Sequence, residues 1–275
     1  MRPINLGNPV NRSAALNRGL AGWWRVLPGR FGGARFLDLL NRQHATLNNG
    51  AAFPSNTSSA AFRHHGHGAI LGDGTDDFIN FGDPTQLQFG SSDVTLSFWC
   101  KPMASHAGVF RFLLSRDDDT TQGFVIGKNS SDVLYAFSRD PDGDSITLTS
   151  SFSLTASTPW FHAIVTRNGI DMAMYVNGVS RATGSNASLG SPFKTGVNWN
   201  GLARTTGNYY GAHLDDVRMS SGGINDAMAM QLYLASLTGY QNELNWLPDA
   251  GVDLVSAAEY RVYKKRISGG SWLHI

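Results

Sequence analysis

The sequence is poor in charge and nearly devoid of glutamate. Only 16% of its 275 residues are charged, against roughly 25% in an ordinary soluble domain. Glutamate occurs at two positions, Glu243 and Glu259, so nearly all of the 21 acidic residues are aspartate. Aspartate suits turns and loop sites better than helix faces. The composition therefore excludes a long helical bundle.

Cysteine and long apolar runs are also scarce. Cys100 is the only cysteine, which excludes an internal disulfide and a cysteine-rich zinc site. No apolar run approaches the roughly 20 residues of a membrane helix. The opening residues lack the apolar stretch of a signal peptide. We therefore expect a chain with no membrane partner that is made and kept in a cytoplasm, unless another route exports it.

Net charge is close to zero but unevenly distributed. The formal charge of +1 at pH 7 creates no global field that would hold a nucleic acid or an anionic membrane. Both ends of the chain are basic, with only Asp38 as an acid in residues 1–42. The basic residues are Arg2, Arg12, Arg18, Arg25, Arg30, Arg35 and Arg42, and in the tail Arg261, Lys264, Lys265 and Arg266. These ends are either simply solvated, or they dock on an acidic partner.

Period-two alternation is the dominant pattern in the middle of the chain. Leu96, Phe98 and Cys100 share one face of a strand, while Ser97 and Trp99 share the other. Two Asn-Gly pairs, at 168–169 and 177–178, predict hairpins with type I′ turns. Strands are predicted at residues 69–71, 78–81, 95–101, 110–115, 123–126, 133–137, 145–150, 160–166, 172–176, 196–203 and 213–219. Many short strands at this spacing indicate an all-β, antiparallel two-sheet sandwich.

One short helix and two extensions complete the expected organisation. Asn225 is the expected N-cap and Asp226 lies in the first turn of a run of good helix formers. Residues 260–267 alternate weakly, which predicts an added edge strand or a segment that folds on a partner. We expect an N-terminal extension at 1–18, one domain at 19–236 and a tail at 237–275.

Several runs in order resemble a known family. They are Gly19–Trp24, Asp38 with His44–Gly50, Gly72–Ile79, Leu96–Pro102, Trp160–Val165, Met174–Gly178 and Gly211–Met219. Together they resemble the LamG-like, concanavalin A-type lectin and glucanase jelly rolls, in variants that look like those encoded in tailed phages and environmental bacteria. The resemblance implies two antiparallel sheets, one of them concave, with ligands on the concave face or at the loops along its rim.

Hydrolysis of a glycan has no obvious machinery in the predicted jelly roll. A retaining glycoside hydrolase needs two carboxylates about 5 to 5.5 Å apart, and glucanases of the resembled fold place glutamates on one concave strand. Both glutamates here lie beyond residue 234, so only an aspartate pair would be a substitute. No Gly-x-Ser-x-Gly, His-Glu-x-x-His or phosphate-loop pattern occurs. We therefore expect a protein that is not an enzyme.

Calcium is the one ion that the aspartates suggest, since Ca²⁺ prefers six to eight oxygen ligands. The candidate ligands are Asp38, Asp77 and Asp215. By alternation Asp77 shares a face with Ile79, and Asp215 with Val217, so both carboxylates need a hydrogen-bond or metal partner. The resemblance implies that these positions bind a structural calcium or tie loops together. The alternative is that they cap turns by accepting backbone N–H groups.

One aromatic cluster is the best sugar-binding candidate. An aromatic ring stacks on the apolar face of a pyranose, and amide side chains bond its hydroxyls. The cluster consists of Trp199, Tyr209 and Tyr210 with Asn198, Asn200 and Asn208. The alternative is that these residues pack at a strand edge or at an interface.

Three functions of different classes follow from these observations. The first is a non-catalytic virion structural protein, a capsid decoration or fibre-associated protein present in many copies. Its basic termini would dock on other virion proteins, and its lectin-like jelly roll would face surface glycans. The second is a bacterial carbohydrate-binding or adhesion module, extracellular or on the cell surface, whose partner is a polysaccharide. The third is a glycan-active enzyme of the same fold.

Overall fold

In the computed structural model the chain divides into two compact units. They are Met1–Asn242 and Glu243–Ile275. The structure describes residues 19–26, 35–40, 42–53, 68–103, 106–117, 122–204, 207–237, 263–265 and 272–274. Among these residues no helix is long and apolar enough to span a bilayer. The predicted N-terminal extension, 1–18, lies outside the described residues.

The first unit is built from two antiparallel sheets. Sheet A has the strand order β1 (Leu20–Trp24), β15 (Gly211–Ser221), β6 (Val94–Pro102), β11 (Phe161–Asn168), β12 (Asp171–Val176) and β13 (Val179–Ser185), and β4 (Ile70–Asp73) also pairs with β15. Sheet B has the order β10 (Ser145–Ser153), β9 (Val133–Arg139), β8 (Gly123–Lys128), β7 (Arg111–Asp117), β14 (Trp199–Gly201), β5 (Phe78–Gly82), β3 (Ala45–Asn48) and β2 (Arg35–Phe36). A short 3₁₀ helix, η3 (Thr85–Leu87), and one α-helix, α1 (Asp226–Leu237), are added to the strands. The predicted all-β jelly-roll sandwich is confirmed.

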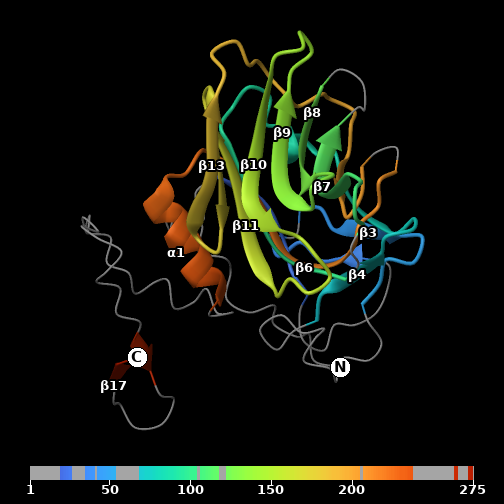
Figure 1. Ribbon diagram of the computed structural model, residues 1–275, viewed down its shortest axis with the longest axis vertical. Helices are drawn as coiled ribbons and strands as arrows, with labels where there is room; N and C mark the ends of the chain where they lie inside the picture. Colours follow the sequence, from blue (N-terminus) through green and yellow to red (C-terminus); the bar gives the residue numbers. More distant parts are fainter. Residues whose placement is uncertain are drawn as a thin grey trace. The chain divides into compact units, whose positions relative to one another are not determined.

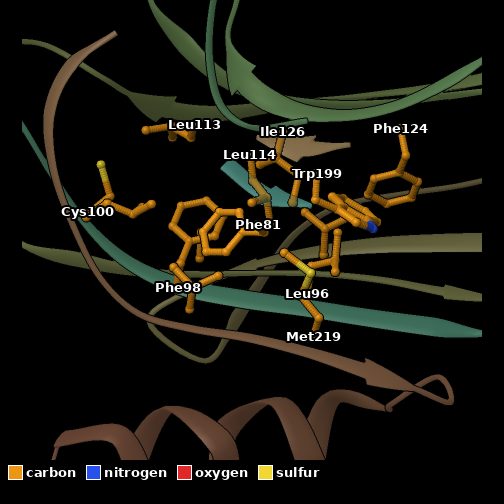
Figure 2. Close-up of a cluster of buried hydrophobic side chains, with 14 of the residues drawn as sticks. Phe81, Leu96, Phe98, Cys100, Leu113, Leu114, Phe124, Ile126, Trp199 and Met219 are labelled. Carbon is orange, nitrogen blue, oxygen red and sulfur yellow. The ribbon is translucent and has the colours of Figure 1, made fainter. Parts of the chain in front are cut away.

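A hydrophobic layer between the two sheets holds the sandwich together. Alternate residues of β6, Leu96, Phe98 and Cys100, point into this layer and are fully buried, as the alternation predicted. Figure 2 shows them facing side chains from sheet B such as Phe81 and Ile126. Burying a large apolar side chain contributes about 1.5–3 kcal/mol. The core therefore fixes which face of every strand points inward.

Helix α1 covers part of the outer face of sheet A (Figure 1). Ala229 and Leu232 of the helix pack on Ile164 of β11 and Tyr175 of β12. The Tyr175 hydroxyl donates a hydrogen bond to the carboxylate of Asp226 in the first helical turn. This outer face is therefore closed by a helix near β11 and β12.

Most predicted strands are present, but the short ones differ. Strand β14 covers only Trp199–Gly201 of the predicted 196–203, and Leu202, directly after it, adopts a positive φ of 60° that ends the strand. Strands β1, β2, β3 and β13 are not among the predicted strands. Three of these four have at most five residues, and β13 is mostly exposed. Neither feature produces the alternation on which the predictions depended.

The two Asn-Gly pairs behave differently. Asn177 and Gly178 both have positive φ, 52° and 76°, and join β12 to β13 as the type I′ turn predicted. Asn168 instead pairs with Asp171, so the two loop residues are Gly169 and Ile170. Only Gly169 has positive φ, 61°. The turn predicted at residues 168–169 therefore lies one residue later, at 169–170.

A bulge in β15 overturns the predicted face of Asp215. The register of β15 against β6 shifts between Asp215 and Arg218. Asp215 is in register with Trp99, so it lies on the outer face and not on the core face of Val217. The extra residue is Asp216, whose φ is 50°. A bulge of this kind re-aims side chains, and alternation cannot detect it.

Asp216 is the centre of a buried polar network that joins β15 to β1. Its carboxylate accepts hydrogen bonds from Nε and Nη2 of Arg218 and from Nε1 of Trp23. The Arg218 guanidinium also lies 4.7 Å from the centroid of the Trp23 ring. Burial alone would raise the pKa of Asp216, but the charges of Arg218 and Arg25 outweigh it and hold the pKa well below its ordinary value. The network is therefore ionised and fully paired.

Strand β13 forms one edge of sheet A. The register of β12 against β13 shifts between Met174, which pairs with Ala182, and Tyr175, which pairs with Ser180. Arg181 is the extra residue of this bulge, and its side chain is exposed. A bulge and a cation are two devices that prevent an edge strand from pairing with another chain.

The second unit contains one hairpin among its described residues. Strand β16 (Tyr263–Lys265) pairs with β17 (Trp272–His274). The strand expected within 260–267 is therefore present as β16. It pairs with β17, inside its own unit.

Buried His213 makes stability depend on pH. Burial, together with the charge of Lys101, lowers the pKa of His213 from 6.5 to about 4. At pH values between about 4 and 6.5, His213 is therefore protonated in the unfolded chain but neutral in the folded chain. We expect the free energy of unfolding to fall by on the order of 3 kcal/mol as pH falls from about 6.5 to 4. Urea unfolding at a series of pH values measures it.

The control for this prediction is a second histidine. His213→Gln should lose this part of the pH dependence, while His44→Gln, which leaves His213 in place, should keep it. Equal pH slopes in the parent protein and in His213→Gln would show that another group causes the effect.

Candidate functional site

The predicted aromatic cluster does not form an exposed platform. Trp199 and Tyr210 are fully buried in the core. The Trp199 ring packs against Phe124 and Phe193, and its Nε1 donates to the carbonyl of Leu87. Neither ring is able to stack on a ligand, so the prediction is wrong for these two residues and the packing alternative holds.

The other members of that cluster are spread apart. Tyr209 is half-buried, with its ring 6.4 Å from that of Phe78. Asn198 and Asn208 are exposed, Asn198 just before β14 and Asn208 in the loop after it. Asn200 points away from the core on sheet B. The sequence cluster is therefore not one site.

Asp38 and Asp215 accept backbone hydrogen bonds. The Asp38 carboxylate accepts N–H groups from Trp23, Leu40, Arg42 and Gln43. Asp215 accepts the N–H of Val26. The bonds to Asp38 tie strand β1 to the turn after Asp38, as the turn-capping alternative predicted.

Asp77 belongs to a group of three carboxylates. Among the described residues, Asp73, Asp76 and Asp77 are the one set of acidic, histidine or cysteine side chains whose ligand atoms lie within 4.8 Å of one another. The Asp77 carboxylate accepts a hydrogen bond from the backbone N–H of Asp73. The Asp73 carboxylate accepts one from the backbone N–H of Thr75. Burial raises the pKa of Asp77 above its ordinary value, and the charges of Asp73 and Asp76 add to the rise. This group is where a cation would fit best.

The outer face of sheet B carries a continuous line of side chains, which we call the transverse row. Each member is in register with the next, and together they cross all eight strands. The transverse row consists of Thr147, Phe137, Val125, Ser115, Asn200, Asn80, Thr46 and Arg35. Residues beside them in the chain, such as Ile126 and Ile79, lie in the core. At about 4.8 Å per strand the row is roughly 34 Å long.

One half of this face is aromatic. Phe112, Val125 and Tyr135 form a cluster on the outer face of sheet B, and Phe137 packs against it. At the rim, Phe110 is 46% exposed and its ring meets that of Tyr135 edge-on at 5.3 Å. Phe112 and Tyr135 are buried, so exposed Phe110 and half-buried Phe137 are the rings of this group that a ligand is able to contact.

The remainder of the face is polar. Thr147 and Thr149 on β10 are exposed, and they lie opposite Phe137 and Tyr135. On the other side of the centre, Asn200 is followed by Asn80 and Thr46. Hydroxyl and amide groups both donate and accept hydrogen bonds. The row therefore combines apolar ring surface with groups that suit ligand hydroxyls.

Arg204 covers the centre of the transverse row. Its Nε and Nη2 each lie 2.6 Å from one carboxylate oxygen of Asp117, and its guanidinium carbon lies 5.5 Å from the Phe112 centroid. The Ser115 hydroxyl donates to the carbonyl of Ala203. Ser115 and Val125 lie between these contacts and are only 0% and 2% exposed, although they point away from the core. Residues 203–204 therefore form a strap across the row.

The strap also sets the electrostatics of the face. Among the described strand residues on this face, Asp117 is the one carboxylate, and Arg204 neutralises it. Burial raises the pKa of Tyr135 above its ordinary value, so its phenol stays protonated and remains a donor at neutral pH. The centre of the row is therefore uncharged overall. It presents neither a paired acid and base nor a nucleophile beside a base.

Sequence reasoning missed this face because its members are distant in the chain. Each is an ordinary outward residue of a different strand, and only the register of eight strands aligns them. One signal was available. Phe137 and Tyr135 alternate with buried residues in a strand whose partner carries Thr147 and Thr149 at the same period.

A two-sheet jelly roll with a ring-and-hydroxyl face is a lectin-like domain by its architecture. Residues 73–227 match the family described as the Concanavalin A-like lectin/glucanases superfamily. The chain belongs to this superfamily, as its resemblance predicted. No curated protein sequence matches the chain.

Solved structures share the fold at low sequence identity. The binding domain of Paraclostridial Mosquitocidal Protein 1 has a TM-score of 0.63 and 18% identity, and the match covers 79% of this chain and 52% of that one. The binding domain of botulinum neurotoxin serotype G has a TM-score of 0.59 and 14% identity, and the match covers 78% of this chain and 50% of that one. Trypanosoma rangeli sialidase, in complex with 2,3-difluorosialic acid, has a TM-score of 0.57 and 12% identity, and the match covers 82% of this chain and 33% of that one. This chain thus spans about half of each binding domain and a third of the sialidase.

Removing Arg204 should uncover the middle of the transverse row. Cys100 is fully buried and burial raises its pKa, so the native thiol is inert. A thiol introduced by Ser115→Cys is therefore a selective reporter. We expect maleimide labelling of Ser115→Cys to become about tenfold faster when Arg204→Ala is added. Mass spectrometry of the labelled protein measures the rates.

Arg181→Ala is the matched control, because Arg181 is exposed on β13 of the other sheet. It should leave the labelling rate of Ser115→Cys unchanged. If Arg204→Ala has no more effect than Arg181→Ala, the strap does not shield the row.

Proposed function

We propose that the protein is a non-catalytic carbohydrate-binding domain whose ligand binds the accessible parts of the transverse row, on either side of the strap. The single observation that carries this proposal is the alignment of an aromatic ring with hydroxyls and amides across the eight strands of sheet B. An extended ligand with ring faces and many hydroxyls, such as an oligosaccharide, matches that alternation. The superfamily and the lectin-like fold support the same class of ligand.

The absence of a glutamate pair supports a binding role over hydrolysis. Among the described strand residues on this face, Asp117 is the one acid, and it is paired with Arg204. A retaining or inverting glycosidase needs two carboxyl groups flanking the bond. The matched solved structures are named as binding domains in two of the three cases above, and the match to the sialidase covers only 33% of that chain.

The virion assignment stays a prediction. It depends on basic ends that dock on other virion proteins, and residues 1–18 and 238–262 lie outside the described residues. The same holds for a multi-copy assembly and for the location, whether in a virion, extracellular or on a cell surface. Neighbouring genes distinguish these cases: a terminase or portal gene supports the virion, and a polysaccharide-utilisation cluster supports a bacterial adhesion or carbohydrate-binding module.

Glycan binding should depend on the two halves of the row. Phe137→Ala removes ring surface worth about 1 kcal/mol, and Asn80→Ala removes hydrogen bonds of similar worth, so each should weaken oligosaccharide binding roughly five- to tenfold. A glycan array identifies the ligand, and titration calorimetry measures the dissociation constants.

Ser180→Ala, an exposed hydroxyl on β13, is the control and should bind like the parent protein. Thermal melting confirms that each variant is folded. Binding that is unaffected by both Phe137→Ala and Asn80→Ala would contradict this location for the site, and release of reducing sugar by the parent protein would contradict the non-catalytic assignment.

We also propose that calcium, where it binds, is held by Asp73, Asp76 and Asp77. Two of these carboxylates are exposed and one is buried, and their oxygens are close enough to share an ion. Burial is the main cause of the raised pKa of Asp77, and calcium would neutralise the repulsion from Asp73 and Asp76 that adds to it. At a hundredfold excess over its dissociation constant an ion adds about 2.7 kcal/mol of stability.

Calcium should therefore raise the melting temperature by roughly 5–10 °C over that in EDTA. Asp76→Asn should abolish this difference, whereas Asp226→Asn, at the start of α1, should keep it. An identical melting temperature in calcium and in EDTA would show that the folded protein does not bind calcium.

A further inference from the structure

A second candidate site lies on the opposite sheet, where β11 and β13 end and β12 begins. It is a groove of about 380 Å³ on the outer face of sheet A. Two lines of registered residues form its floor: Thr166, Ala173 and Thr183 in one, and Asn168, Asp171 and Ser185 in the other. Five of these six side chains are polar. The groove is separate from the transverse row, which lies on sheet B.

The chain that enters α1 forms the wall of this groove. Ile224 lines it, and the Ile224 N–H donates to the Thr166 hydroxyl. At Gly223 the backbone runs so close to Asn168 that an added Cβ would lie 2.7 Å from the Asn168 Cβ. Thr166 also bonds the Val94 carbonyl. The wall is therefore fixed against the floor by short contacts.

Four polar side chains in the groove have no hydrogen bond to the protein. Asn168, Asp171, Thr183 and Ser185 are exposed, and none of them makes a side-chain hydrogen bond or an ion pair within the described part of the chain. They supply an amide, a carboxylate and two hydroxyls around the small apolar floor of Ala173. Groups that are not committed to the fold are free to bond a ligand.

From this arrangement we propose that the groove binds a small neutral polyhydroxylated ligand, a single sugar unit. A volume of about 380 Å³ is at the lower end of the range for small-molecule sites. A carboxylate accepts bonds from two neighbouring hydroxyls, and the amide and hydroxyl groups both donate and accept. Ala173 and Ile224 provide the apolar surface for a ring face. Among the described residues that line the groove, Asp171 is the one charged side chain. A divalent cation is usually held by several carboxylates, so a neutral ligand fits this lining better.

The consequence is a domain with two separate sugar sites on its two sheets. The groove would take one terminal or branching unit, whereas the transverse row would take an extended chain. The groove does not depend on the row, because the two share no residue. Its failure is therefore distinguishable from failure of the proposed function.

Saturation-transfer NMR with single sugars tests the groove directly. The panel is glucose, galactose, mannose and N-acetylglucosamine, each titrated against the parent protein. We expect at least one to bind with a dissociation constant in the millimolar range. Asp171→Ala should weaken that binding about tenfold through the loss of charge-assisted hydrogen bonds. Ala173→Trp should abolish it by filling the floor.

Two variants outside the groove serve as controls. Ser180→Ala and Arg181→Ala, both on β13 outside the groove, should keep single-sugar binding unchanged. Melting temperatures show whether Ala173→Trp is folded, and Asp171→Ala provides the test if it is not. The inference is overturned if no sugar of the panel binds below about 10 mM, or if binding survives both Asp171→Ala and a folded Ala173→Trp.

Discussion

The buried ion pair between Asp216 and Arg218 is the constraint on which the rest of the structure depends. Two charges of this kind are costly to bury and stay in place only when every partner is present. Strand β15 carries both residues and pairs with β1, β4 and β6. The Trp23 ring closes the network from β1. The bulge at Asp216 thus fixes the register of β15, and through it the placement of the three strands that pair with β15.

A second constraint acts on sheet B through the core. Its eight strands include very short ones, such as β14 with three residues and β2 with two. These strands have little pairing energy of their own, so buried rings such as Trp199 and Phe36 anchor them. Anchoring on the inner face is what aligns Asn200 and Arg35 with their neighbours on the outer face. A residue proposed from the sequence as a ligand platform, Trp199, therefore acts indirectly by setting the register of the row.

The sequence was sufficient for the fold class and for most long strands, because alternation and core burial act over a few residues. It located α1 and the type I′ turn at Asn177 and Gly178. It was wrong about the face of Asp215, since a bulge inverts alternation, and about Trp199 and Tyr210, since both lie in the core. It did not contain the transverse row or the groove, because each depends on pairing between strands that are distant in the chain.

The bulge and the exposed Arg181 on edge strand β13 limit how copies of this chain associate. A sheet grows from one molecule to the next only where a flat edge offers its backbone N–H and C=O groups in register. The bulge at Arg181 breaks that register in sheet A. Any assembly of copies along this edge must then use contacts between side chains, which leaves the backbone edge out of the interface and makes continuous cross-β growth from β13 unfavourable.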